Sequence, residues 1–562
     1  MIKISCITFF LSSYLGSAYS QSSVRGHNPE DFIFDNLDRS VKPGNDFFSF
    51  ANGGWIKKNP IPATESSWGI GNLIEDTIRN KLLIVNKQAA QSHAAPGTDL
   101  QKIGDFYSTA MDSAKVDAQG IEPLQPYLRA IDSIKDLRGI WTMAAKMASI
   151  GSGTFFGFYV SQDDKNSDKN QVILSQGGLG LPNRDYYFSK LTRFQTVRNA
   201  YSPHISGMLV LAGYPQGNAG REAAQIFKFE TALAGASRPL QDLRDPYANY
   251  HKLDIKGLSG LMPSVDWPSW FKTAGLASVD TVIVGQPEFM QALEKQVKLM
   301  PLDVLKSYLK WNLVTDYSSA LPTPVNTESF HFYGTLINGQ TMQKPRWKRV
   351  IDEENRYMGM LLGKLFIKAY FSPAAKLRYT KMVNDVLAAY AERIRSLDWM
   401  SDTTKLKALV KLASVTYKIG YPDKWLDYST MNISTGSYFS NLVEAKKWSH
   451  RDMIAQYGKP VDRSRWGMFP QTYNAYYNPS NNEIVLPAAM MAVPGLRDEE
   501  IDDAVAYGYT AGSTIGHEIT HGFDDQGRQY DERGNLRSWW TKGDEGRFNK
   551  KRKCSPISLI TM

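Results

Sequence analysis

The spacing of apolar residues along the chain predicts a protein built mainly from helices. Apolar positions recur every three or four residues through 75–150 and 190–300, which is the period of an amphipathic helix. The clearest such helix spans residues 376–397, and a further helix is expected near 401–417. Charged residues cover the other side of the 376–397 helix, and we expect its apolar stripe to pack into a core. The stripe consists of Val383, Val386, Leu387, Tyr390, Ile394 and Leu397.

A few short stretches have the pattern of strands. Residues 155–174 predict a hairpin whose loop is the polar stretch 163–170. Two further extended runs, at 474–477 and 483–487, are separated by turn residues. Pro487 ends the second run and disfavours a central position for it in a sheet. The expected fold class is therefore mainly α with small β elements.

A last helix is predicted over residues 498–521. Acidic residues occupy its first turn, where the helix dipole favours negative charge, and Gly522 is suited to a left-handed cap at its end. Glycines recur every fourth residue along this helix, at a cost of about 1 kcal/mol each relative to alanine. They are Gly508, Gly512 and Gly516. Two interpretations stay open: another backbone approaches this face closely, or the helix is exposed and loosely packed.

The composition is that of an ordinary globular protein. Of the 562 residues, 42% are hydrophobic and 22% are charged. The formal net charge is +9, and the 65 basic and 56 acidic residues are interspersed. Because no basic stripe is present, we expect no nucleic-acid partner. No stretch after residue 20 approaches 18 uninterrupted apolar residues, so no transmembrane segment is expected.

The first 20 residues have the pattern of a secretory signal peptide. Lys3 supplies the positive start, residues 4–15 the apolar run and residues 18–20 a cleavage site of small residues. Residues 21–35 are polar and are expected to be flexible. The exported chain would keep only Cys554 and form no internal disulfide, which favours a bacterial source. We therefore expect an exported protein, periplasmic or extracellular.

The candidate chemistry lies in the segment His517-Glu518-Ile519-Thr520-His521. Two imidazoles four residues apart share one face of a helix, where a single zinc ion can bridge them. Glu518 lies beside them and can take a proton from a zinc-bound water. Two surface histidines on an amphipathic helix are the alternative, but the motif falls inside a predicted helix, as the chemistry requires.

Residues 517–540, HEITHGFDDQGRQYDERGNLRSWW, resemble the M13 family of zinc metallopeptidases. This is the group of neprilysin, endothelin-converting enzyme and bacterial oligopeptidases. The resemblance extends from about residue 36 to residue 549 and includes several other segments. They are residues 40–48, 52–55, 181–187, 418–422, 474–477 and 486–488.

The resemblance implies a role for each residue of the candidate site. His517 and His521 would bind one Zn²⁺ ion, and Glu518 would be the general base. Asp524 would accept a hydrogen bond from a ligand imidazole and fix its tautomer. The implied activity is that of a zinc metalloendopeptidase, which hydrolyses peptide bonds by means of a zinc-activated water.

The resemblance also implies how substrates bind. Asn474 and Ala475 would pair with the backbone of an extended peptide, which adds a strand to a sheet edge. From the sequence alone, a turn role is favoured for Asn474. The implied fold has two largely helical domains around a central cavity, together with a thermolysin-like zinc domain. Such enclosure restricts substrates to oligopeptides and short unfolded segments.

The patterns divide the chain into regions. We expect a mainly helical region at 36–420, a connection at 421–470, the catalytic region at 471–549 and an aberrant tail at 550–562. The family's third zinc ligand is a glutamate farther from His521 than the 41 residues that follow it here. We therefore expect a catalytic region that is incomplete at its C-terminus, weak zinc binding and little or no hydrolysis.

Three alternatives stay open at this stage. Glu545, 24 residues beyond His521, could serve as the third ligand. The chain could instead be a non-catalytic peptide-binding protein that keeps the Asn474 strand, or the product of a truncated gene.

Overall fold

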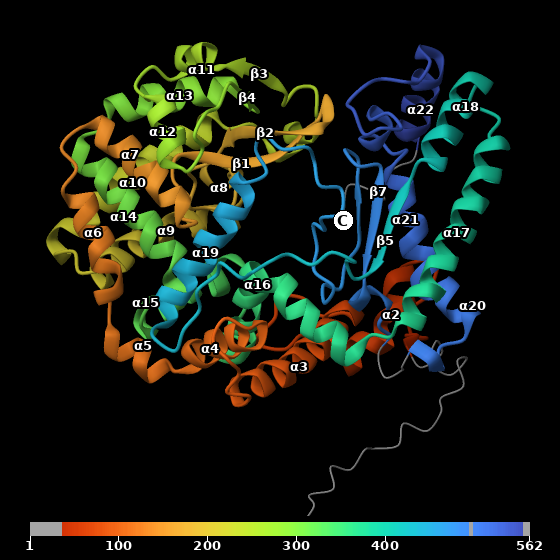
Figure 1. Ribbon diagram of the computed structural model, residues 1–562, viewed down its shortest axis with the longest axis horizontal. Coiled ribbons are helices and arrows are strands. Elements are labelled where there is room, and N and C mark those ends of the chain that lie inside the picture. Colours follow the sequence, from red (N-terminus) through yellow and green to blue (C-terminus); the bar gives the residue numbers. More distant parts are fainter. Residues whose placement is uncertain (1–35, 494–497, 555–562) are drawn as a thin grey trace, which may run out of the picture. The chain divides into compact units, whose positions relative to one another are not determined.

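The computed structural model describes residues 36–493 and 498–554 and divides the chain into two compact units, residues 1–62 and 63–562. The predicted signal peptide, the polar stretch 21–35 and residues 555–562 of the predicted tail lie outside the described residues. Figure 1 gives the labels used below.

The described part of the first unit contains the helix α2 (Phe47–Lys58). Asp46 caps it, since its carboxylate accepts a hydrogen bond of 3.0 Å from the backbone N–H of Ser49. The Lys57 ammonium lies 2.7 Å from the Asp38 carboxylate and, with Ser40, lowers the pKa of Asp38 to about 2. Gly53 is required here, because a Cβ atom on it would lie 2.6 Å from the Cβ of Asp38.

Helices make up most of the second unit. The first group is α3 (Ile70–Gln91), α4 (Asp99–Met111), α5 (Ser113–Gln119), α6 (Gln125–Asp132), α7 (Leu137–Ser149), α8 (Asp185–Phe188), α9 (Thr192–Leu211) and α10 (Gln216–Ala236). The second group is α11 (Ile255–Leu261), α12 (Trp267–Thr273), α13 (Pro287–Leu299), α14 (Leu302–Asp316), α15 (Thr323–Ser329), α16 (Arg346–Tyr370), α17 (Pro373–Arg395), α18 (Asp402–Ala413), α19 (Tyr438–Ile454), α20 (Asp503–Val505), α21 (Gly516–His521) and α22 (Lys542–Cys554). The predicted fold class, mainly α with small β elements, is confirmed.

Short 3₁₀ and π segments connect or extend these helices. The 3₁₀ segments are η1 (Glu122–Leu124), η2 (Leu240–Arg244), η3 (Ser318–Ala320), η5 (Ala488–Met491), η6 (Asp498–Glu500) and η8 (Gly527–Gln529). The π segments are η4 (Phe330–Ile337) and η7 (Ala506–Ile515).

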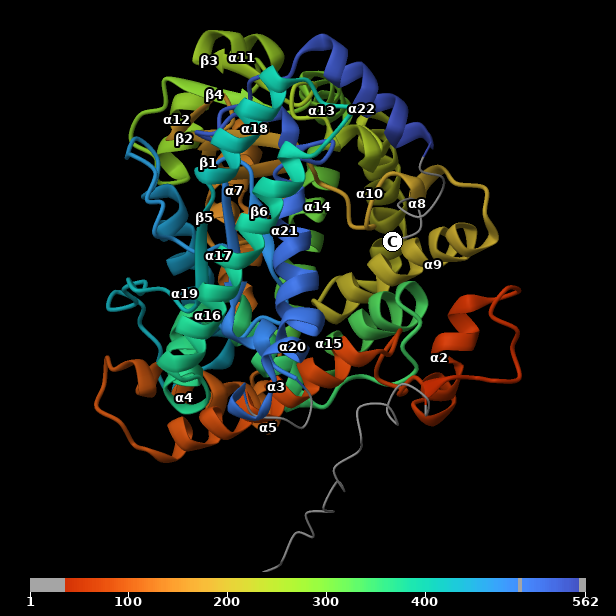
Figure 2. The ribbon, with the colours of Figure 1, turned by 90° about the vertical axis from the view of Figure 1, so that its right-hand side faces the viewer.

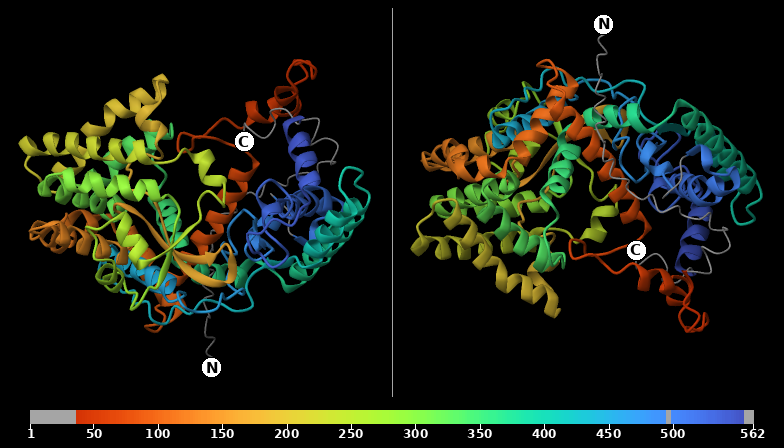
Figure 3. Two further views of the ribbon diagram at one scale, coloured as in Figure 1. Left: turned by 90° about the horizontal axis from the view of Figure 1, so that it is seen from above. Right: turned by 90° about the horizontal axis from the view of Figure 1, so that it is seen from below.

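A four-stranded sheet lies among the helices of the second unit, as the view from above in Figure 3 shows. Its order is β1-β2-β4-β3, with strands β1 (Phe156–Asp163), β2 (Asn166–Gln176), β3 (His251–Asp254) and β4 (Thr281–Val284). The predicted hairpin is confirmed as β1 and β2. Its loop is shorter than predicted, because the polar residues 166–170 continue strand β2 instead of leaving the sheet.

The second sheet has three strands in the order β5-β7-β6: β5 (Thr416–Gly420), β6 (Tyr476–Asn478) and β7 (Glu483–Pro487). Strand β7 pairs in parallel with β5 and antiparallel with β6, so it is the central strand. The expectation from Pro487 was therefore wrong. Pro487 is the last residue of the strand, where its missing N–H removes only a terminal ladder bond.

Two apolar cores hold the second unit together. The larger core contains residues from the helices α3 through α16, from the four-stranded sheet and from α19. The smaller one joins α17, α18, the three-stranded sheet and α21, and Figure 2 shows α17 and α21 side by side. The predicted stripe of α17 lies in this smaller core, with Val383 fully buried. None of the helices in the described part of the chain combines the length and apolarity needed to span a bilayer.

Candidate active site

The helix α21 presents the two histidines of the motif side by side. Their Nε2 atoms lie 3.0 Å apart, and the ring planes cross at 87°. The opposite face of the helix carries Ile515 and Ile519, which are buried in the smaller core. Tyr390 of α17 donates a hydrogen bond of 2.6 Å to the backbone oxygen of Gly516. The two imidazoles therefore project from a helix that is packed on its other side, as the four-residue spacing predicts.

The approach to this helix differs from the prediction. Residues 506–515 form the π segment η7, and the right-handed backbone of Gly522 (φ −64°) excludes the expected left-handed cap. Among the atoms that the structure describes, a Cβ atom on Gly508 would meet none within 4 Å, and one on Gly516 would meet only the Tyr390 side chain. At these two glycines the interpretation of a closely approaching backbone is wrong.

Asp524 fixes the orientation of the second histidine. Its Oδ2 atom lies 2.7 Å from Nδ1 of His521, and its Oδ1 atom accepts hydrogen bonds from the backbone N–H groups of Gln526 and Gly527 at 2.9 and 2.8 Å. Because the carboxylate is an acceptor, the proton of a neutral His521 ring lies on Nδ1. The lone pair on Nε2 then points toward the ring nitrogen of His517.

The turn after α21 requires a glycine at position 527. A Cβ atom there would lie 1.8 Å from the backbone oxygen of His521. The close approach lets the N–H of Gly527 reach the Asp524 carboxylate. Gly527 therefore helps to orient the imidazole of His521, six residues earlier, through Asp524.

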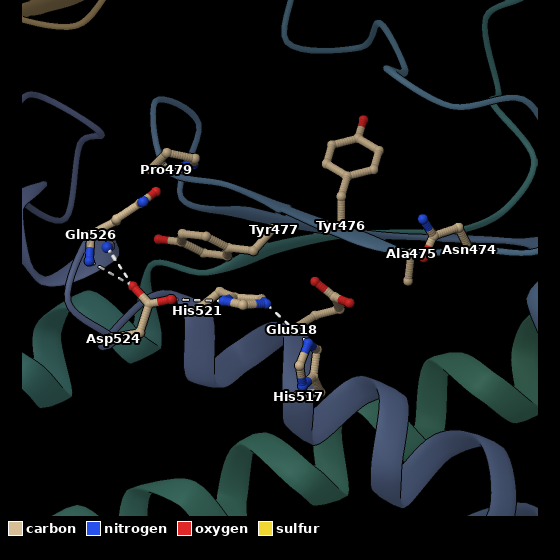
Figure 4. Close-up of a pocket in the computed structure, with 11 residues that line it drawn as sticks. Asn474, Ala475, Tyr476, Tyr477, Pro479, His517, Glu518, His521, Asp524 and Gln526 are labelled. Carbon is tan, nitrogen blue, oxygen red and sulfur yellow. Dashed lines mark hydrogen bonds and ion pairs between the residues drawn. The ribbon is translucent and has the colours of Figure 1, made fainter. Parts of the chain in front are cut away.

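Glu518 is the carboxylate nearest to the two rings. It is 6% exposed, and burial raises the pKa of its carboxyl, an effect opposed by His521, His517 and a backbone hydrogen bond from Tyr477. Figure 4 shows its carboxylate beside the rings and below the strand that carries Tyr476 and Tyr477. A partly desolvated carboxylate in this position can accept and return a proton.

A cavity of about 390 Å³ lies between the helix and the sheet. Strand β6, which forms one wall with the residues before it, is at the edge of the three-stranded sheet. The lining residues come from both sides: Asn474, Ala475, Tyr476, Tyr477 and Pro479 from the strand segment, and His517, Glu518, His521, Asp524, Gln526 and Gly527 from the helix and its following turn. All six site residues predicted from the sequence are thus brought together at one cavity (Figure 4).

The donor set suits a zinc ion in part. Two imidazole nitrogens bound to one tetrahedral zinc ion at about 2.0–2.1 Å lie about 3.3 Å apart, close to the observed 3.0 Å. Among the residues that the structure describes, no group of three or more His, Cys, Asp or Glu side chains is arranged to hold a metal ion. Glu545 of α22 is engaged elsewhere, since its carboxylate lies 3.2 Å from the guanidinium of Arg528. Among the described residues, His517 and His521 are therefore the candidate zinc-binding pair.

Sequence reasoning gave no role to Lys411 of α18. The structure buries this lysine to 1% exposure behind the turn that carries Asp524. A signal was available, because Lys411 follows Thr404 and Ala408 at helical spacing, and all three lie on the buried side of α18. A lysine on the buried stripe of an amphipathic helix indicates a polar partner inside the fold.

A helix that presents two imidazoles and a carboxylate to a cavity below a sheet edge is the arrangement of the HExxH class of metallopeptidases. Comparison with known sequences narrows the class. Residues 43–422 and 474–557 match Peptidase family M13. The chain therefore belongs to peptidase family M13, a family of zinc metallopeptidases, and the resemblance predicted from its motifs is confirmed.

Individual relatives agree with this assignment. The chain is 31% identical to human endothelin-converting enzyme 1 over 543 residues, which cover 93% of this chain and 69% of that protein. It is 29% identical over 551 residues to neprilysin-3 from Drosophila melanogaster, again covering 93% of this chain and 69% of the relative.

Solved structures share the fold. The inhibitor complex of the zinc metalloprotease Zmp1 from Mycobacterium tuberculosis superposes with a TM-score of 0.87 at 35% identity, over 92% of this chain and 78% of Zmp1. PepO from Lactobacillus rhamnosis superposes with a TM-score of 0.82 at 25% identity, over 91% of this chain and 81% of PepO.

Proposed function

We propose that this protein is a zinc-dependent metalloendopeptidase that hydrolyses oligopeptides in the cavity between α21 and β6. The observation that carries the proposal is the pair of Nε2 atoms 3.0 Å apart, with Glu518 beside them and a sheet edge across the cavity. Membership of family M13 supports the same activity.

His517 and His521 would hold the zinc ion, and Asp524 would keep the lone pair of His521 directed at it. When bound, zinc supplies a Lewis acid that polarises the scissile carbonyl and lowers the pKa of a water molecule. Glu518 accepts the proton of the attacking water and then delivers it to the leaving amine. Its burial keeps this proton transfer away from bulk solvent.

The edge strand would position the substrate. The outer side of β6 is not paired within the sheet, so an extended peptide can add there as a further strand. The Oδ1 atom of Asn474 accepts a hydrogen bond of 2.9 Å from the backbone N–H of Ala475, in the segment that immediately precedes the strand. Asn474 and Ala475 then offer their remaining polar groups to the peptide backbone.

We also propose that the protein is exported. The support comes from the sequence pattern of residues 1–20 alone, since the structure does not describe these residues. Zmp1 and PepO, two structural relatives, come from bacteria, in agreement with a bacterial source. The peptide substrates would then be met in a periplasm or outside the cell.

The test is to measure zinc content and cleavage of a quenched fluorescent peptide for the wild type and for His517→Ala. The exposed His331, on η4, provides the matched control His331→Ala. Because the described residues offer two zinc-binding side chains, we expect weak zinc binding and slow zinc-dependent cleavage in the wild type and the control, and loss of both in His517→Ala. Peptide binding without cleavage would instead support a non-catalytic peptide-binding protein, and a chain that cannot be obtained folded would support a gene remnant.

A further inference from the structure

Lys411 is a fully buried lysine that lies behind the active-site cavity without lining it. Its side chain extends from α18 and is 1% exposed. Its Nζ atom donates hydrogen bonds of 2.6 and 2.7 Å to the backbone oxygens of Gly527 and Tyr530. Desolvation lowers the pKa of this ammonium to about 7, against the attraction of Asp531 and Asp524. Such burial is unfavourable for a charged group unless its donors are satisfied.

On one side, Lys411 is connected to the histidine helix. The backbone oxygen of Gly527 accepts from Nζ, while the N–H of the same residue donates to Asp524. Asp524 in turn holds Nδ1 of His521 at 2.7 Å. Three consecutive hydrogen bonds therefore join the lysine to the imidazole, and they pass through the turn in which only glycine fits at position 527.

On the other side, Lys411 is connected to the substrate strand. Its backbone oxygen accepts a hydrogen bond of 2.9 Å from Nδ2 of Asn482, in the β6–β7 turn. The Oδ1 atom of Asn482 accepts from the Tyr477 hydroxyl at 2.7 Å. Asn482 has a positive φ of 48°, a left-handed conformation in which asparagine is enriched among non-glycine residues, and these bonds hold the turn in that conformation.

Aromatic rings from β6 and from the segments after α21 lie around the ammonium. Its Nζ atom lies 6.0 Å from the ring centre of Tyr477 in β6 and 5.8 Å from that of Phe523, which follows α21. Trp539 lies at 5.8 Å and donates its indole N–H to the backbone oxygen of Tyr530, the second acceptor of the lysine. One buried cation thus contacts segments of both walls of the cavity.

We propose that Lys411 is a positioning residue, which sets the distance and orientation of the His521 imidazole relative to the β6 edge. Its effect on catalysis rests on the proposed function, whereas its effect on the turn at 524–530 does not. A lysine with a merely structural role would affect stability alone. A positioning role predicts that its removal loosens the Asp524 turn and weakens metal binding in a protein that is still folded.

The experiment compares Lys411→Met with Lys407→Met. Methionine keeps most of the buried apolar stem and removes the donor. Lys407 is the matched control, an exposed lysine one turn earlier on the same helix, with a single hydrogen bond of 3.2 Å to the backbone oxygen of Trp539. Amide hydrogen exchange of residues 522–530 is measured without metal, zinc affinity by competition with a chelator, and thermal unfolding reports the fold.

We expect exchange at Gln526 and Gly527 to be about tenfold faster in Lys411→Met. We also expect zinc affinity to fall about 10- to 100-fold, the usual effect of disturbing the groups that orient a metal ligand. Lys407→Met should differ from the wild type by less than twofold in both measurements. Peptide turnover should fall through kcat more than through KM, because the imidazole is displaced more directly than the strand.

Equal exchange and equal zinc affinity in the two variants would overturn the proposal. If Lys411→Met is not folded, Lys411→Gln, which keeps an NH₂ donor group on a side chain one atom shorter, takes its place. Misfolding of both would assign the lysine to the core alone and would also overturn the proposal. A wild type that neither binds zinc nor cleaves peptide defeats the proposed function, but the exchange rates of residues 522–530 would still decide the role of Lys411.

Discussion

Two buried glutamates in this protein differ in their surroundings, since one is enclosed by hydrogen-bond donors of the protein and the other lines the cavity. Glu230 of α10 is 0% exposed, and its Oε2 atom accepts hydrogen bonds of 2.7 Å from the hydroxyls of Tyr187 and Tyr201 and of 3.3 Å from the N–H of Gly180. Glu518 is nearly as buried, but it lies beside two imidazoles and lines a cavity of about 390 Å³. Burial raises the pKa of both carboxyls, to about 7 for Glu230.

The comparison separates a perturbed carboxyl from a reactive one. The donors around Glu230 come from the protein itself and hold the segment 180–187 against α9 and α10, so a proton taken up there affects stability. Glu518 faces a space that a water molecule and a peptide can enter. A raised pKa alone therefore identifies neither site, and access decides between a structural and a chemical role.

The largest expected effect is a loss of turnover that distinguishes the two glutamates. Glu518→Gln removes the proton acceptor beside the attacking water and should lower kcat by about 100- to 10,000-fold, with zinc still bound. Glu230→Gln should leave kcat within about twofold. The measurement is cleavage of a quenched peptide by both variants at equal zinc content. A similar loss of kcat in both variants would show that access to the cavity does not distinguish the roles of the two glutamates.

The second prediction concerns the pH dependence of stability. The folded-state pKa of Glu230 is raised from 4.5 to about 7, so above pH 4.5 the unfolded chain releases this proton while the folded protein retains it. The free energy of unfolding therefore falls as pH rises from about 4.5 to about 7, by about 3 kcal/mol from this group. Above pH 7 the penalty is constant.

Glu230→Gln should remove this part of the slope, as measured by urea unfolding between pH 4.5 and 8. Glu392→Gln, at an exposed position on α17, is the control and should keep the slope of the wild type. If Glu230→Gln and the wild type lose stability in parallel with rising pH, the tyrosine-bound carboxyl is not the group that titrates.

Much of the candidate site could be predicted from the sequence because it depends on local spacing. Four residues on a helix place His517 and His521 on one face whatever the rest of the fold does. Asp524 follows closely enough to reach back to His521 through a single turn. The edge position of the strand after Asn474 came from the family resemblance, since nothing local distinguishes an edge strand of three residues from a turn.

The remaining features depend on contacts between residues far apart in the sequence. The π segment before α21 and the central position of β7 follow from packing against α17 and β5, which the local pattern does not contain. Glu230 lies among Ile226, Phe229 and Leu233 on the buried face of α10, so the sequence pattern contains a charged residue on an apolar stripe. Its partner Tyr187 comes from the short helix α8, 43 residues earlier, a pairing that only the fold brings about.

A smaller effect is expected where a carboxylate acts through a histidine. Asp524→Asn keeps the size of the side chain but cannot serve as a charged acceptor for Nδ1 of His521, so zinc affinity should fall about 10- to 100-fold. Asp423→Asn, at an exposed carboxylate paired with Lys376, should leave it unchanged. Chelator competition measures both. Unchanged affinity in Asp524→Asn would mean that the helix alone orients the ring.

The smallest effect is expected for a substitution at Asn474, on the wall of the cavity that the strand segment forms. Asn474→Ala removes a side chain that accepts one hydrogen bond, from the N–H of Ala475, so about 1 kcal/mol of substrate alignment is lost and KM should rise about fivefold with kcat nearly unchanged. Asn80→Ala, at an exposed asparagine of α3 bonded only to its own helix, should change neither constant. A fall in kcat without a rise in KM would place Asn474 with Glu518 in the chemical step. The cavity would then have reactive groups on both walls, and the contrast with the enclosed Glu230 would extend to the strand as well as the helix.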